Sequence, residues 1–370
     1  MLASFGEVMA TIGYVLLAVL VLLIMITVHE LGHYIVGKIF GFKIEEFAIG
    51  FGPKLFSKKK KDGEVFSIRA LPLGGFCAFS GEDEESKDPN DFNNKKPWQR
   101  ILVLIAGAFM NYLFALLIIV IMFASYGQTA LMTYKLNEST GAQQEYSFNE
   151  KDVIVSVNGK NVYLTTDIIL TLDGKKQGEL VNFGVKRQNE FKVIKVALKK
   201  DANFASVEDM KTFYDVLGIY YELDENQNVV NGGLYSTRIR FGFFETIGRT
   251  FEYSFKLAGT IFAVIGQLLT GKLGVSSVGG TVTTISLTAT AMRTGGFWYL
   301  LYISSFIGVN LAVFNLLPIP ALDGSRVIFT IIEWIRKKPI NRKVEGTIHF
   351  VGLIILFAFA IFADLQQCFW

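Results

Sequence analysis

The sequence has little charge and few cysteines for its length. Charged residues make up 19% of its 370 residues, against roughly 25% in soluble domains, and the mean hydropathy is +0.39. An ordinary soluble protein is therefore excluded, and so is a disordered chain, because 33 Phe and 14 Tyr supply too much apolar surface. The two cysteines, Cys77 and Cys368, are too few for a disulfide scaffold. A net charge of +3 is too small to indicate binding to nucleic acid.

Several uncharged runs are long enough to cross a bilayer, which takes about 20 apolar residues. Four such runs are found at 8–28, 101–125, 296–322 and 346–363. A shorter apolar stretch, 257–271, indicates an amphipathic helix at the membrane interface. Residues 273–292 are uncharged but rich in Gly, Ser and Thr, so we expect irregular or re-entrant structure there. The sequence predicts an α-helical membrane protein with about four transmembrane helices.

The distribution of Lys and Arg predicts the orientation of these spans. Residues 38–100 carry twelve of them and residues 1–28 carry none, while five more lie in 336–343. Because basic loops stay in the cytoplasm, both termini and the long segment 126–295 are expected outside. Residues 1–7 lack the basic start of a cleavable signal peptide. We therefore expect a multi-pass protein of the cell membrane.

Four regions follow from this pattern. Residues 1–125 hold the first two spans with a cytoplasmic loop, and 246–295 form an amphipathic or re-entrant connector. Residues 296–370 hold the last two spans. Residues 126–245 alternate strand and turn signals, among them the turn Asn158-Gly159, which indicates a small β-rich domain outside the membrane. Within the cytoplasmic loop, the apolar segment 71–79 is expected to form a β-hairpin that leans into the membrane.

The most informative residues are His29-Glu30-Leu31-Gly32-His33, at the end of the first apolar run. Residues four apart share a helix face, so both imidazoles can reach one metal ion while Glu30 acts on water beside it. The chain has only three histidines, so chance gives this pattern about one time in a thousand. Ionisable residues within a span are costly and are usually functional. The motif predicts a zinc site with Glu30 as general base.

A catalytic zinc ion usually has three protein ligands and an open position, so a third ligand is required. Asp323 follows two prolines that interrupt the third long run, in the sequence Asn315-Leu-Leu-Pro-Ile-Pro-Ala-Leu-Asp-Gly324. His33 and Asp323 are both expected toward the cytoplasmic ends of their spans, which favours Asp323. His349 is expected on the same side, so depth alone leaves it open as an alternative ligand.

Three segments together give the chain a close resemblance to a known family. They are the His29–His33 motif, residues 106–115 on the second span, and Asn315–Gly324 on the third. With these segments the whole chain resembles the site-2 proteases, which are intramembrane zinc metalloproteases. It is most similar to their bacterial RseP-like branch, which carries a PDZ domain between the second and third core spans. The stretch Asp152–Gly159 is similar to the most recognisable part of such a domain.

The resemblance implies a role for each matching residue. His29, His33 and Asp323 would hold Zn²⁺, Glu30 would be the general base, and Asn315 would contact the substrate backbone. The location implied is the bacterial plasma membrane. The substrates implied are single-span membrane proteins, such as a pre-cleaved anti-sigma factor or signal-peptide remnants. This process is regulated intramembrane proteolysis.

The segment 71–79 resembles the membrane-associated hairpin of that family. An extended substrate can pair with an exposed strand edge, so Gly74 and Gly75 are candidate substrate-binding residues. One departure concerns the loop before the third core span. The chain has Gly279-Gly280-Thr281 where the family often has a Gly-Pro pair.

Two other functions compete with proteolysis. A membrane scaffold could bind zinc without cleaving anything and recruit partners through its PDZ domain. Glu30 argues against this function, because a structural zinc site is closed by four ligands and needs no general base. A transport function that uses carboxylates inside the membrane is a still weaker alternative, because the two halves of the sequence show no obvious repeat.

Overall fold

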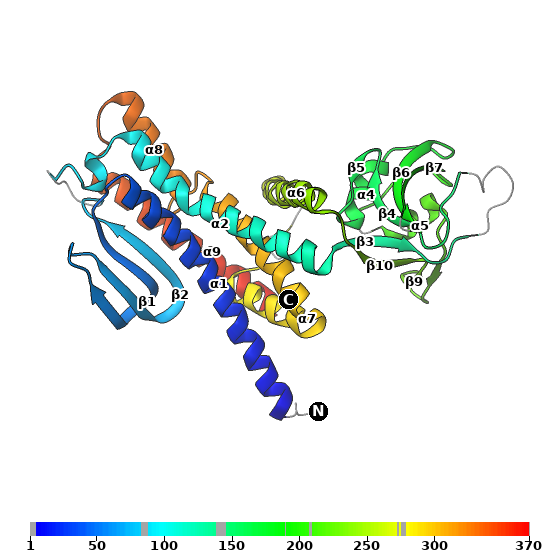
Figure 1. Ribbon diagram of the computed structural model, residues 1–370, viewed down its shortest axis with the longest axis horizontal. Helices are drawn as coiled ribbons and strands as arrows, with labels where there is room; N and C mark the ends of the chain where they lie inside the picture. The colour runs from blue at the N-terminus through cyan, green and yellow to red at the C-terminus, as the bar shows by residue number, and fades with distance from the viewer. Residues whose placement is uncertain are drawn as a thin grey trace. The chain divides into compact units, whose positions relative to one another are not determined.

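The computed structural model describes residues 5–82, 88–137, 146–188, 190–206, 209–271, 274 and 279–369. Its internal contacts divide the chain into two units, 122–249 and the remainder. Among the described residues, four helices are long and apolar enough to cross a membrane: α1 (Phe5–Ile39), α2 (Pro97–Tyr126), α7 (Thr281–Asn315) and α9 (Arg342–Phe369). The four predicted spans are thus confirmed as helices (Figure 1).

Small residues bring α1, α2 and α7 together. A Cβ atom at Gly32 of α1 would overlap the carbonyl oxygen of Ala106 in α2. A Cβ atom at Gly308 of α7 would lie 3.0 Å from the Cβ of Ala115 and 3.4 Å from the sulfur of Met25. Small residues at such crossings let helix backbones approach closely, which is how membrane helices associate. This packing holds the His29–His33 turn of α1 against α2.

The loop between α1 and α2 forms a two-stranded sheet of long, bent strands, β1 (Ile44–Lys59) and β2 (Val65–Phe79). Residues 46–49 pair with 75–78 on one side and with 65–68 on the other, while 56–59 pair with 65–68. The segment 75–79 is therefore an edge, and no other described strand pairs with it. Segments 65–68 and 75–78 run in opposite directions on the two sides of 46–49, so β2 reverses between them, near Gly74, whose φ is +152°. The strand paired with 75–79 is 46–49, so the hairpin expected over 71–79 is part of the larger β1–β2 sheet.

The stretch 257–271 is helical, as expected, but its helix is longer. It lies in α6 (Phe243–Leu269), which has one apolar face and is not among the helices apolar enough to span a membrane. Exposed phenylalanines lie along α6, including Phe251, Phe255 and Phe262. A helix of this kind suits the membrane interface.

Residues 281–292 are helical, which corrects the expectation of irregular structure over 273–292. Two interactions explain the difference. The Asp364 carboxylate of α9 accepts a hydrogen bond of 2.9 Å from the backbone N–H of Thr283, and so caps the start of α7. The hydroxyls of Thr284 and Thr288 donate to carbonyls four residues earlier. A Thr-rich sequence therefore forms a helix whose polar groups are satisfied. Residues 272–273 and 275–278 of the same stretch lie outside the described residues.

The helix α7 is kinked at Gly296, whose φ is +65°, and ends at Asn315 instead of the expected 322. Proline cannot continue a helix, and Pro318 and Pro320 follow directly. The chain then turns and starts α8 (Asp323–Arg336), so that Asp323 stands at a helix N-terminus.

The unit 122–249 is built on one six-stranded antiparallel sheet, with strand order β10-β3-β4-β6-β7 and with β5 paired to β4. The strands are β3 (Gln128–Thr133), β4 (Val153–Val157), β5 (Lys160–Asn161), β6 (Leu180–Arg187), β7 (Glu190–Ala197) and β10 (Leu234–Ile239). A small sheet is added by β8 (Tyr221–Leu223) and β9 (Val229–Gly232). The helices α4 (Thr165–Leu172) and α5 (Met210–Leu217) contribute Ile169 and Phe213 to the buried core around Phe183. The expected β-rich segment is confirmed.

Candidate metal centre

Helical spacing in α1 places His29 and His33 on one face, with their Nε2 atoms 3.1 Å apart. Both residues are buried, at 8% and 7% exposure. The carboxylate oxygen Oδ2 of Asp323 lies 3.0 Å from Nε2 of His29 and 3.3 Å from Nε2 of His33. Residues almost 300 positions apart therefore present three ligand atoms to one point.

The spacing of these three atoms fits a zinc ion. Tetrahedral zinc with bonds of 2.0–2.2 Å places its nitrogen and oxygen ligands about 3.3–3.6 Å from one another. The three separations here run from 3.0 to 3.3 Å, which is close to this range and slightly shorter. The Oδ2 atom of Asp323 is also buried without a hydrogen-bond partner among the described residues, as a ligand oxygen would be. Three protein ligands leave one position open, which is the arrangement of catalytic zinc sites.

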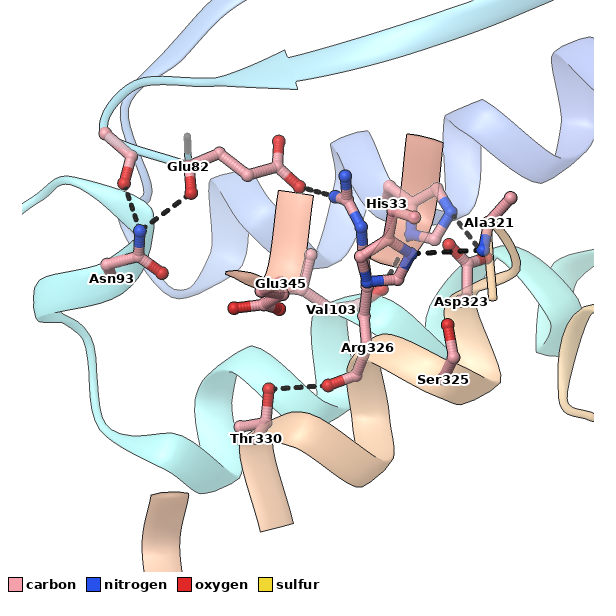
Figure 2. Close-up of polar contacts among 12 residues, drawn as sticks. His33, Glu82, Asn93, Val103, Ala321, Asp323, Ser325, Arg326, Thr330 and Glu345 are labelled. Carbon is pink, nitrogen blue, oxygen red and sulfur yellow. Dashed lines mark hydrogen bonds and ion pairs between the residues drawn. The ribbon is translucent and has the colours of Figure 1, made fainter. Parts of the chain in front are cut away.

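Each imidazole has a second contact that fixes which nitrogen faces the metal. The Nδ1 atom of His33 lies 2.8 Å from the carbonyl oxygen of Val103 in α2 (Figure 2). Only a donor pairs with a carbonyl, so Nδ1 carries the proton and Nε2 keeps its lone pair for the metal.

The Nδ1 atom of His29 faces two side-chain amides, those of Asn111 at 3.5 Å and Asn315 at 3.4 Å. Asn111 is fully buried, and its Oδ1 has no hydrogen-bond partner among the described residues. Turning this amide over, which leaves its shape unchanged, lets Oδ1 accept the Nδ1 proton of His29. The same turn satisfies the buried oxygen. Asn111 therefore orients His29 from α2, and the amide of Asn315 lies beside the same Nδ1 atom.

Gly107 of α2 covers the two imidazoles. A Cβ atom there would lie 2.5 Å from Nε2 of His33 and 2.8 Å from Nε2 of His29. Gly107 and Asn111 are one helical turn apart, so both face the ligands. Neither residue was assigned an individual role from the sequence, although the stretch 106–115 that contains them carried part of the family resemblance.

Glu30 lies between the metal site and the edge segment 75–79. Its carboxylate accepts a hydrogen bond from the backbone N–H of Cys77. A Cβ atom at Gly75 would lie 3.4 Å from Cγ of Glu30, and one at Gly74 would overlap the ring of Phe51. Cys77 is a free thiol, and the side chain of Cys368 lies outside the described residues. The expected base and the two expected substrate-binding glycines thus lie on the same side of the site.

The turn before Asp323 is held by α9. Ala321 has a left-handed backbone, with φ +79°, a conformation that costs a non-glycine residue on the order of 1 kcal/mol. Its N–H donates a hydrogen bond of 3.1 Å to Nδ1 of His349, and a Cβ atom at Gly352 would overlap Pro320. His349 is therefore not in the ligand group, and instead fixes the turn that carries Asp323.

A polar hollow of about 470 Å³ adjoins Asp323. Its lining includes Arg326, Glu82, Glu345 and His349. Arg326, one turn beyond Asp323, reaches across to form an ion pair with Glu82 (Figure 2). This lining gives water a polar space beside the half-buried Asp323.

The His29-Glu30-x-x-His33 pair and a helix-borne aspartate, set among apolar helices, define a membrane metallopeptidase. The chain belongs to peptidase family M50, the site-2 proteases, whose family model matches residues 17–359. It is a zinc metalloprotease.

Similar proteins cover nearly the whole chain. A Clostridium perfringens protein that carries a zinc metalloprotease name is 35% identical over 96% of this chain and 98% of its own length. Another such protein, from Fusobacterium nucleatum, is 31% identical over 95% of this chain and 97% of its own length. The zinc metalloprotease RasP of Bacillus licheniformis is 28% identical over 92% of this chain and 96% of its own length.

Proposed function

We propose that this metalloprotease hydrolyses a peptide bond within or near the transmembrane segment of a single-span membrane protein. The observation that carries this proposal is the position of His29 and His33, which lie on α1, a helix long and apolar enough to span a membrane. The substrates proposed are a pre-cleaved anti-sigma factor or a signal-peptide remnant. The alternative, a scaffold that binds zinc without cleaving a substrate, is not favoured, because the similar proteins carry zinc metalloprotease names.

The roles proposed for the residues follow from their contacts. His29, His33 and Asp323 would hold zinc, which when bound polarises the scissile carbonyl and acidifies water. Glu30 would take the proton from the attacking water and deliver it to the leaving amide nitrogen. The N–H of Cys77, which donates a hydrogen bond to the Glu30 carboxylate, would hold that carboxylate in place for this step.

The edge segment 75–79 is the proposed binding place of the substrate backbone. A helix hides its amides, so the substrate must unwind before it is cut. An unwound stretch can then pair with the open side of 75–79 and lie beside Glu30. Asn315, whose amide lies 3.4 Å from Nδ1 of His29, would contact the same stretch near the metal.

Comparing wild type with Glu30→Gln tests the proposed function. Both proteins should hold about one zinc ion, because Glu30 is not a ligand. Cleavage of a single-span substrate in detergent should fall by 10²–10⁴-fold in the variant, as expected on losing a general base. Equal cleavage by both proteins would show that Glu30 is not the base. If neither cleaves several unrelated substrates, the scaffold function regains support.

A proline at Gly75 tests the substrate edge. Proline removes one backbone N–H and stiffens the segment, so cleavage by Gly75→Pro should fall at least tenfold while zinc content stays unchanged. The matched control is Leu55→Pro, which places a proline near the opposite edge of the same sheet. Unchanged cleavage by Gly75→Pro, or equal losses in both variants, would contradict strand pairing at this edge.

We propose a plasma-membrane topology from the distribution of Lys and Arg. Both termini and the PDZ-like unit would lie outside, and the metal centre would lie toward the cytoplasm. The unit would either dock substrates or admit only those already trimmed outside.

A further inference from the structure

A basic hollow in the unit 122–249 has no part in the function described above. It has a volume of about 400 Å³ and is lined by Val153, Ile239, Gln188 and four cationic residues. The cations are Lys151, Lys186, Arg238 and Arg240. No carboxylate is among the described lining residues, so the hollow suits an anion.

The two arginines place this hollow at the end of a membrane-spanning helix. Arg240 donates a 2.5 Å hydrogen bond to the carbonyl of Ser125, and the guanidinium of Arg238 lies 5.7 Å from the ring centre of Tyr126. Ser125 and Tyr126 are the last two residues of α2. Tyrosines at the ends of spans lie at the level of the lipid headgroups, so the hollow lies at that level too.

Exposed aromatic side chains follow β10 directly. Phe243 and Phe244, at the start of α6, are 73% and 87% exposed. Phe191 is also exposed, stacks on Phe241, and lies under the ammonium of Lys186. Aromatic rings beside Lys and Arg are typical of surfaces that rest at a membrane interface.

We propose that this hollow binds the phosphate of an anionic phospholipid in the leaflet where α2 ends. The positive charge of the lining favours an anion, and the position of the hollow at the end of α2 favours a lipid headgroup over a soluble ion. The aromatic side chains would contact the acyl region while the four cations surround the phosphate. Such a lipid would hold the unit 122–249 against the membrane surface, and this role is independent of the metal centre.

Lipid titration of the full-length protein in detergent, followed by native mass spectrometry, tests the site. Wild type should bind phosphatidylglycerol at least tenfold more tightly than phosphatidylcholine. The double variant Lys151→Gln/Lys186→Gln should lose about 30-fold in phosphatidylglycerol affinity, on the order of fivefold for each lysine. The matched control, Lys160→Gln/Lys195→Gln, removes two exposed lysines of the same unit outside the hollow, and should stay within twofold of wild type.

Three results would overturn the proposal. They are equal retention of the two lipids by wild type, equal losses in both double variants, and displacement of phosphatidylglycerol by millimolar inorganic phosphate or by an acidic peptide. The first would leave no selectivity for charge, and the last would assign the hollow to a soluble anion or a protein partner. Lys151→Gln alone, at an exposed residue, repeats the test should the double variant fold poorly.

Discussion

At the scale of single residues, the metal centre depends as much on missing side chains as on present ones. Gly32 lets α1 reach the backbone of α2, and Gly107 leaves room for the imidazoles of His29 and His33. The His-Glu-x-x-His spacing predicted the two histidines and Glu30 as site residues, and the expected depth of Asp323 in the membrane favoured it as the third ligand. The roles of Gly107 and Asn111 could not be predicted, because they depend on how α2 packs against α1.

Gly107→Ala should weaken zinc binding on the order of 10- to 100-fold, as does loss of a residue that orients metal ligands. The reason is that the added methyl group would push His33 and His29 out of position. Zinc retention against a graded chelator measures this, without any cleavage assay. Gly266→Ala in α6, where a Cβ atom meets nothing within 4 Å, is the control and should retain zinc like wild type. Equal retention by all three proteins would show that the imidazoles tolerate the methyl group.

At the scale of elements, hydropathy located the four spans but not their ends. The start of α7 was missed because its cap, Asp364, comes from α9. The bends of β1 and β2 were missed because they follow from glycine φ angles that the sequence does not reveal.

The same sheet carries a buried carboxylate, Glu64, whose side chain is 2% exposed and pairs with Lys38 at 2.5 Å and Lys60 at 2.8 Å.

Glu64 should make this sheet less stable in acid. Burial raises the pKa of Glu64, but hydrogen bonds from Lys38 and Lys60 outweigh it and hold the pKa below its ordinary value of 4.5. A lowered carboxyl pKa stabilises the fold above the ordinary value, and this stabilisation is lost as the pH falls through the folded-state pKa. Relative to wild type, Glu64→Gln should lose roughly 1–3 kcal/mol near pH 7, and the difference should shrink as the pH falls below 4.5.

Thermal unfolding of both proteins between pH 3.5 and 7 measures this difference. Glu225→Gln, at an exposed turn of the other unit, serves as the control and should follow wild type at every pH. A wild-type advantage that is constant across the range would mean that Glu64 does not titrate with folding.

At the scale of the whole molecule, the chain joins a membrane unit to a β-rich unit through two neighbouring strands. Gln128 at the start of β3 pairs with Ile239 at the end of β10, so the β-rich unit begins and ends at nearly the same place. The alternation of strand and turn signals predicted this unit.

Replacing residues 126–245 by a short Gly/Ser linker tests whether the unit excludes untrimmed substrates. If it does, the shortened protein should cleave a full-length single-span substrate as fast as a trimmed one, whereas wild type should cleave only the trimmed form. Cleavage of the trimmed substrate by the shortened protein is the control for folding. Continued rejection of the full-length form would mean that the unit is not a size filter.

The hydrogen bond between Ala321 and His349 has a thermodynamic consequence for the last helix. Coupling between two binding events is reciprocal. If the docking of α9 favours metal binding by placing Asp323, metal binding must stabilise the docked α9 by the same free energy. Bound zinc would then stabilise the packing of the last helix as well as that of the first. In a metal-depleted protein, α9 should undock first, although it lies far along the sequence from the histidines.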